Sequence, residues 1–285
     1  MKMLGAGMAL WLALAGTAAH AAEHGIYTLA DGDARVLRAL TWYRLAPGAR
    51  VEPGDVVDVA EHAGVQLELA QGGTLNVQGP ALLYAETLPL PGDKPALPDE
   101  LTLLRGWCKV GAAAKSRAVA LHLPTASVVV ANGVAVVHGE DAVAEIFVES
   151  GSARIATPVV RGKANARDAH EGEYWRRTGD RAFEIEHSPP SAFIGAMPRD
   201  LRDALPALAA HFAGPPPELP AGREVTFVEA APWLAGPARR TFARRFAPRL
   251  RDPAFRAEAA AARTIPEWDR TLHPERYRPP ASAAD

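Results

Sequence analysis

Polar and apolar residues alternate with a period of two from about residue 51 to residue 185. In the stretch 65–69, for example, three aliphatic residues are separated by a glutamine and a glutamate. Successive side chains of a β-strand point to opposite faces of its sheet, so this alternation predicts strands with one buried face. The stretches 119–123 and 144–149 repeat the pattern. The larger part of the chain is therefore predicted to be a β-domain.

Turn signals rich in glycine and proline separate these predicted strands. Asn132-Gly133 favours a tight hairpin, because both residue types tolerate positive φ angles. The proline-rich stretch 89–98 is expected to be an exposed loop, because proline has no N–H to donate to a neighbouring strand. Short strands with regularly spaced turns are typical of a sandwich, a barrel or a solenoid.

The hydrophobic period changes near residue 188. Leu201, Leu205 and Leu208 follow one another at helical spacing. Pro198 and Pro206 limit this stretch to short helices, because proline interrupts the hydrogen bonding of a helix interior.

A second helical stretch begins after residue 227. Phe242, Phe246 and Leu250 fall on one stripe, and Asp252-Pro253 has the residue types of an N-cap and a first helical turn. The chain is thus predicted to be mainly β, followed by an α-helical C-terminal region. The predicted divisions are a signal peptide at 1–21, a β-domain at 22–187, short helices with a proline-rich linker at 188–222 and an arginine-rich helical tail at 223–285.

Residues 1–21 have the composition of a cleavable secretory signal peptide. Lys2 supplies a positive start, residues 4–15 form an apolar run, and Ala19-His20-Ala21 places small residues at the cleavage positions. A membrane-spanning helix needs roughly 20 apolar residues, so this run is too short for an anchor. No later segment is apolar enough to span a bilayer. We therefore expect a periplasmic protein that is not transmembrane.

Composition narrows the class of protein further. The contents of 48% hydrophobic and 22% charged residues are those of a globular chain. A formal net charge of −2 argues against nucleic acid as the main partner. Cys108 is the single cysteine, so no intramolecular disulfide can form, and we expect it to be a buried, inert thiol.

Several segments of the β region, in this order, resemble the FecR domain, the periplasmic β-rich module of bacterial envelope sensors. Each segment corresponds to a strand, a turn or a hairpin of that family, and together they cover roughly half of the chain. They are 64–69 with 72–77, 103–110, 123–128, the hairpin 146–155 and Glu171-Gly172-Glu173-Tyr174.

The resemblance implies a β-solenoid or sandwich-like binding module. The sequence departs from the family at its central strand, where the usual Gly-Thr-x-Phe element is replaced by Gly133-Val134-Ala135-Val136. The best-known members place this domain after a cytoplasmic anti-sigma segment and a membrane helix, and neither is expected here. The resemblance therefore points to a binding module and not to a particular signalling circuit.

No catalytic motif is found in the sequence. It has no Gly-x-Ser-x-Gly, no phosphate-binding loop and no nucleotide fingerprint. His170-Glu171 begins like a zinc-protease motif, but Tyr174 stands where the second histidine is required. Glu145 and Glu149, four residues apart on a strand, would lie roughly 13 Å apart, too far for a glycosidase pair. We predict no catalytic residue, no cofactor and no metal site.

The helical tail carries an excess of positive charge. Between Arg223 and Asp285 there are twelve arginines and eight acidic residues. Arg239, Arg240, Arg244 and Arg245 are predicted to lie on one helix face opposite the phenylalanines. They form either a solvated face or a docking surface for an anionic partner, such as lipid headgroups, lipopolysaccharide phosphates or an acidic protein.

Two functions follow from these patterns. The first is a non-catalytic periplasmic protein that acts through protein–protein contacts in envelope sensing or assembly, with an envelope protein as partner. The alternative is a module that binds glycan, peptidoglycan or lipopolysaccharide. It would stack sugars on exposed aromatics, and the candidates are Trp107, Trp175, Trp233 and Trp268.

Overall fold

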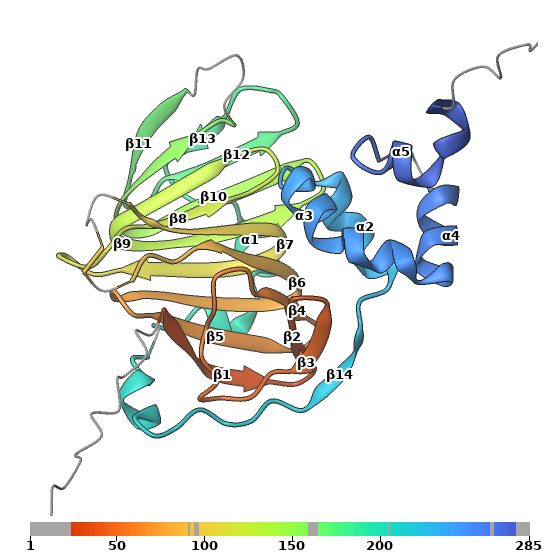
Figure 1. The fold of residues 1–285 in the computed structure, drawn as a ribbon. Coiled ribbons are helices and arrows are strands. Elements are labelled where there is room, and N and C mark those ends of the chain that lie inside the picture. Colours follow the sequence, from red (N-terminus) through yellow and green to blue (C-terminus); the bar gives the residue numbers. More distant parts are fainter. Residues whose placement is uncertain are drawn as a thin grey trace, which may run out of the picture.

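The computed structural model describes residues 24–90, 92–93, 97–158, 165–204, 206–262 and 265–277. The strands form one open 14-stranded sheet, and the helices follow it in the chain (Figure 1). The prediction of a mainly β protein with a helical C-terminal region is confirmed. The predicted signal peptide, Leu205, Arg263 and the end of the chain from Arg278 lie outside the described residues.

The elements are short except for four long strands. The strands are β1 (Gly25–Asp31), β2 (Ala34–Arg38), β3 (Thr41–Arg44), β4 (Val56–Val59), β5 (Gly64–Leu69), β6 (Gly73–Thr87), β7 (Asp99–Ala112), β8 (Val119–His122), β9 (Ser127–Glu140), β10 (Val143–Ala156), β11 (Ala166–His170), β12 (Tyr174–Thr178), β13 (Glu184–Glu186) and β14 (Ala221–Glu224). The helices are α1 (Ser191–Ala196), α2 (Phe227–Ala235), α3 (Arg239–Phe246), α4 (Pro253–Ala261) and α5 (Asp269–Leu272), with 3₁₀ turns η1 (Arg199–Leu201), η2 (Ala209–Phe212), η3 (Ala247–Arg251) and η4 (Pro274–Tyr277).

Each long strand changes neighbours halfway along its length. The first half of β6 pairs with β5 and its second half with β4, while β7 pairs first with β8 and then with β9. β9 and β10 change partners in the same way. The long strands therefore bend from one layer to another. Of the two forms that the FecR resemblance left open, the strands adopt the sandwich-like one.

We call the two layers A and B. Layer A holds β1, β5, β12, β13, the first halves of β6 and β10, and the second halves of β7 and β9. Layer B holds the remaining strands and the other halves. The strand pairings among the described residues are antiparallel except β7–β8, which is parallel. The strands bend at Gly106 (φ +106°) and Gly133 (φ +138°), and glycine is favoured at both because other residues rarely adopt positive φ angles. At Gly133 a Cβ atom would also lie 2.2 Å from the Ser150 carbonyl oxygen.

The main hydrophobic core lies between the layers. Alternate residues of each strand fill it, among them Leu67, Val77, Leu103 and Ile146. Cys108 is one of these residues, is fully buried and is not in a disulfide. Burial raises the pKa of its thiol, as the sequence led us to expect for an inert cysteine.

The chain after β13 wraps around the outside of this sandwich. Phe193 of α1, Met197 directly after that helix and Leu201 of η1 pack on the outer face of layer A, against Trp107 and Tyr174. Charged and amide side chains of layer A then bind the backbone that follows. Lys109 donates to the carbonyls of Leu201 and Asp203, Gln66 donates to that of Pro206, and Glu68 accepts from the amides of Leu208 and Ala209.

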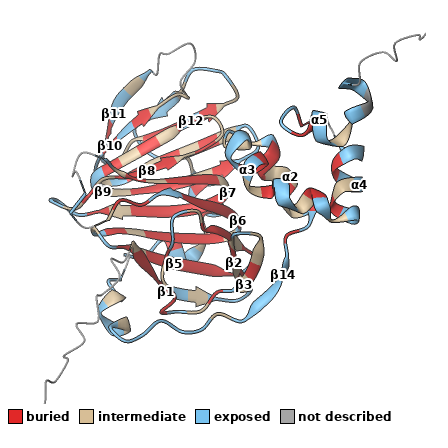
Figure 2. Ribbon diagram, in the orientation of Figure 1, coloured by how far each residue is buried: buried red, intermediate tan, exposed pale blue. Residues whose placement is uncertain are grey.

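The chain then passes the sheet edge and covers part of the outer face of layer B. β14 pairs with β3, and α2 and α3 lie against the sheet, with α4 and α5 farther out (Figures 1 and 2). Strand and helix residues share one apolar cluster there, in which the ring of Phe242 lies 4.9 Å from Tyr84 and 4.7 Å from Trp233. No helix among the described residues has the length and apolarity to cross a membrane.

Candidate functional site

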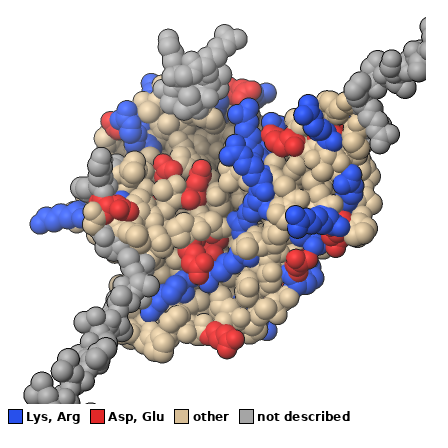
Figure 3. All heavy atoms as spheres, in the orientation of Figure 1, with Lys and Arg blue, Asp and Glu red and all other residues tan. Residues whose placement is uncertain are grey.

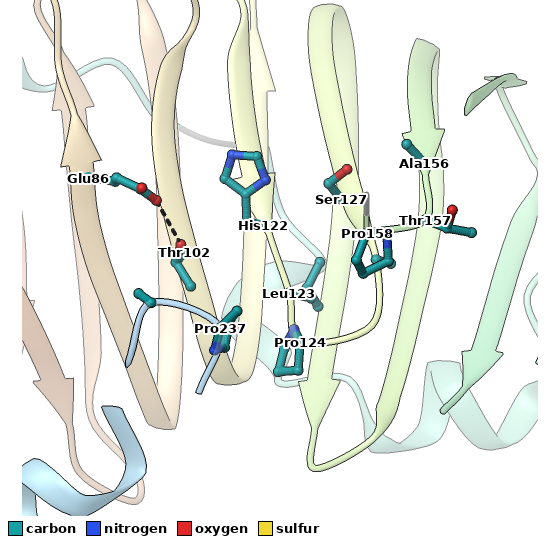
Figure 4. Close-up of a pocket in the computed structure, with 12 residues that line it drawn as sticks. Glu86, Thr102, His122, Leu123, Pro124, Ser127, Ala156, Thr157, Pro158 and Pro237 are labelled. Atoms are coloured by element: carbon teal, nitrogen blue, oxygen red, sulfur yellow. Dashed lines mark hydrogen bonds between the residues drawn. The ribbon is translucent and has the colours of Figure 1, made fainter. Parts of the chain in front are cut away.

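Part of the outer face of layer B is not covered by the helices and forms a groove of about 350 Å³. Figure 4 shows Glu86, Thr102, His122 and Ser127 on four neighbouring strands, with Pro237 approaching from the segment before α3. The groove therefore begins where the helical layer ends.

Strand register explains the shape of this groove. Thr102, His122, Ser127 and Ala156 form one row across β7, β8, β9 and β10, because each is paired with the next. In the neighbouring row, Ala120 and Val129 are also short or medium-sized side chains. Three of the four residues in the first row have small side chains. These side chains project little from the sheet, so the space above them remains open as the groove.

The polar groups of the groove are hydrogen-bonding groups spread along its length. The Thr102 hydroxyl donates to Glu86 over 3.3 Å, and Glu86 makes no ion pair with any other described side chain. His122, Ser127 and Thr157 add further groups that can donate or accept. Prolines 124, 158 and 237 form parts of the rim. Such an arrangement suits recognition of a polar and flexible surface.

The structure separates the four arginines that the sequence placed on one face. Arg240 and Arg244 are exposed and lie one helical turn apart on α3. Arg239 is paired with Glu267, with 3.3 Å between Nε and Oε1. In the space-filling view, basic side chains form a band over α3 and along the boundary between helices and sheet (Figure 3).

Arg245 points inward and binds the sheet. Its guanidinium donates to the carbonyls of Leu37, at 2.8 Å, Ala39, at 2.9 Å, and Gly54. Burial lowers the pKa of Arg245 from its usual value. Arg245 therefore attaches α3 to β2 and its neighbours. The predicted anionic-partner surface stays a prediction, now for Arg240 and Arg244.

The four tryptophans proposed as sugar platforms are buried. Their exposed fractions are 9% or less, and they pack on aromatic or aliphatic neighbours. Trp107 stacks on His138 with 4.2 Å between ring centroids, beneath α1. None of the four presents an open aromatic face, so the glycan-binding alternative loses the aromatic platform on which it depended.

Glu145 and Glu149, weighed above as a carboxylate pair, take separate roles. Glu145 Oε2 lies 2.8 Å from His138 Nδ1, and its other oxygen accepts from the Tyr174 hydroxyl. Burial alone would raise the pKa of Glu145, but these two hydrogen bonds hold it below its usual value. Glu149 instead pairs with Lys109, at 2.7 Å. Within the described ranges, no group of three His, Cys, Asp or Glu residues could hold a metal ion.

The sequence did not identify the groove. Its polar residues come from four consecutive strands, and each of them looks like an ordinary position of an alternating pattern. The one local signal is the Leu123-Pro124 turn, which lies in one of the FecR-like segments. The path of the chain around the sandwich decides which parts of the sheet are covered by helices. The alternation of residues within one strand carries no information on this path.

No protein-family model matches this chain, and no curated protein matches it. Among solved structures, two crystal structures of a candidate anti-sigma factor from Parabacteroides distasonis are similar to it. Both are 12% identical, with TM-scores of 0.39 and 0.40. They cover 47% and 50% of this chain, which spans 59% and 64% of theirs. TM-scores below 0.5 are too low to establish a shared fold.

Proposed function

We propose that this chain is a non-catalytic, FecR-like periplasmic protein that acts through protein–protein contacts in envelope sensing or assembly, and that the layer B groove is its contact surface. The observation that carries the proposal is the half-covered face of layer B. The helical layer packs on Leu82 and Tyr84 of this face. Pro237 lies at the edge of that layer and lines the groove.

The groove suits a segment of a partner protein. Its floor of small side chains lets a backbone approach the sheet closely. Glu86, Thr102 and Ser127 offer acceptors and donors to the amide and carbonyl groups of such a segment. A segment lying there would continue the layer that α2 and α3 begin. A stable interface buries roughly 800 Å² per partner, so the rim and part of the helical layer must take part.

The signal-peptide pattern at residues 1–21 and the ordered FecR-like segments support the periplasmic and FecR-like parts of the proposal. We expect the mature protein to begin at Ala22, which the mass of the protein purified from the periplasmic fraction would establish. Recovery of the full-length chain from the cytoplasm would contradict this location.

Site-specific photo-crosslinking in the native cell tests the contact surface. Benzoylphenylalanine is introduced at Pro237 or Thr157 on the groove rim and, as a control, at exposed Glu184 on β13. We expect the same discrete protein adduct from both rim positions and none from Glu184. The substitution Ser127→Trp fills the groove floor, so it should abolish these adducts. Adducts that persist in Ser127→Trp, or that also form at Glu184, would overturn the assignment.

A further inference from the structure

The helical layer contains a second cavity, of about 380 Å³, between α2 and the end of α4. It is separate from the layer B groove and shares no lining residue with it. Among the described residues, its lining side chains are all hydrocarbon except one. The hydrocarbon lining is Phe227, Ala231, Leu234 and Ala235 of α2, with Ala262 and Ile265.

The exception is Arg239, at the first position of α3. Arg239 also lines an adjoining open pocket formed by residues 236–241, together with Arg240. Among the described residues, the Arg239 side chain is paired with Glu267 alone, with 3.3 Å between Nε and Oε1, and it is 43% exposed. The apolar cavity is therefore lined by one guanidinium group, that of Arg239, while Arg240 lines the adjoining pocket and is exposed to solvent.

The surface of α2 extends the apolar character out of the cavity. Val228, 72% exposed, lies three and seven residues before Ala231 and Ala235, which places the three on one side of the helix. An exposed aliphatic residue next to an apolar cavity provides further surface along which a hydrocarbon chain can lie.

We propose that this cavity binds a single-chain fatty acid. Its alkyl chain would occupy the space between α2 and α4, and its carboxylate would be held by Arg239 and Arg240. A mostly apolar pocket with a few convergent polar groups is the usual form of a small-molecule site. Guanidinium groups bind carboxylates well through two parallel hydrogen bonds.

The lining favours an alkyl chain over a peptide. Apart from Arg239, no lining side chain in the described part of the chain can donate or accept a hydrogen bond, so peptide amides buried there would lose their hydrogen bonds to water without replacement. An alkyl chain has no such groups. The cavity is also small, at about 380 Å³, so the second chain of a phospholipid would remain in water.

Calorimetric titration of the full chain with monomeric dodecanoate, below its micelle concentration, tests this proposal. Dodecanol is the matched neutral ligand. We expect saturable 1:1 binding of dodecanoate and at least tenfold weaker binding of dodecanol. Absence of dodecanoate binding would overturn the proposal, as would equal affinity for the two ligands. Binding only to anionic vesicles, or only to an acidic hydrophobic peptide, would overturn it too.

Three variants localise the site. Ala235→Trp fills the cavity from its exposed rim, and the double variant Arg239→Gln/Arg240→Gln removes the cations. We expect each to weaken dodecanoate binding at least tenfold. Arg251→Gln removes an exposed arginine of η3 that does not line the cavity, and its affinity should stay within twofold of the parent. Unchanged thermal unfolding shows that each variant is folded. Unchanged affinity in the first two variants would refute this location.

Discussion

Asp99 is a buried carboxylic acid at the start of β7. Asp99 is 2% exposed, and its Oδ2 atom has no hydrogen-bond partner among the described residues. Burial raises the pKa of Asp99 to about 6, although Arg117 opposes the shift. In the unfolded state, an aspartate has a pKa of about 3.9, as in model peptides. The folded state therefore binds a proton more tightly than the unfolded state.

This difference has a definite sign for stability. Because the pKa is higher in the folded state, the contribution of Asp99 is most favourable below pH 4 and is lost as the pH rises to 6. The loss amounts to at most about 3 kcal/mol, since one pKa unit corresponds to about 1.4 kcal/mol.

Asp99→Asn should therefore stabilise the protein at neutral pH. We expect its free energy of unfolding at pH 7.5 to exceed that of the parent by about 1–3 kcal/mol, and the gain to shrink towards pH 4. Urea denaturation of the parent and the variant across this pH range measures the difference between their free energies of unfolding. The contributions of other titrating groups cancel in this difference. A gain that does not depend on pH would show that Asp99 is not the group responsible.

At the scale of elements, α3 is attached to the sheet by a polar contact as well as by its phenylalanines. Arg245 binds three backbone carbonyls of the β-domain, while its sequence neighbour Arg244 is exposed and contacts none of them. The two residues therefore form a matched pair for a test in which the charge change is the same.

Arg245→Ala should lower the free energy of unfolding by about 2–4 kcal/mol, because buried carbonyls lose charged hydrogen-bond donors. Arg244→Ala should change it by less than about 0.5 kcal/mol. Hydrogen exchange of α2 and α3 amides would show where the structure loosens. Equal effects of the two substitutions would contradict the inward role of Arg245.

At the scale of the whole molecule, the helical region serves as the outer cover of the sandwich. Trp42, Leu82 and Tyr84 on layer B belong to one buried apolar cluster with residues of α2 and α3. Trp107 and Tyr174 on layer A are buried by the chain around α1. The boundary predicted near residue 187 therefore cuts through two apolar clusters.

A chain of residues 24–187 should consequently expose both clusters and associate. We expect it to bind a hydrophobic dye and to unfold at a lower temperature than residues 24–277, because each uncovered large side chain costs about 1.5–3 kcal/mol. Residues 24–213, which keep the cover of layer A, should show an intermediate effect. A monomeric 24–187 chain with an unchanged unfolding midpoint would instead show that the β-domain is independent.

Much of this fold could be predicted from local patterns. The alternation at 65–69 and 144–149 corresponds to β5 and β10, and the stripe of Phe242 and Phe246 corresponds to the buried side of α3. These patterns depend on residues close together in sequence. Period two and period 3.6 therefore identify strands and helices without knowledge of the partner surface.

The sites depended on the tertiary structure. The sequence grouped Arg239, Arg240, Arg244 and Arg245 by spacing, but the turn of α3 against β2 directs Arg245 into the protein. The groove exists because one half of layer B is covered and the other half is not. By itself the sequence determined strands such as β5 and β10, the helix α3 and the core-facing side of each. Tertiary packing decided which faces stay open, because that depends on contacts between segments more than a hundred residues apart.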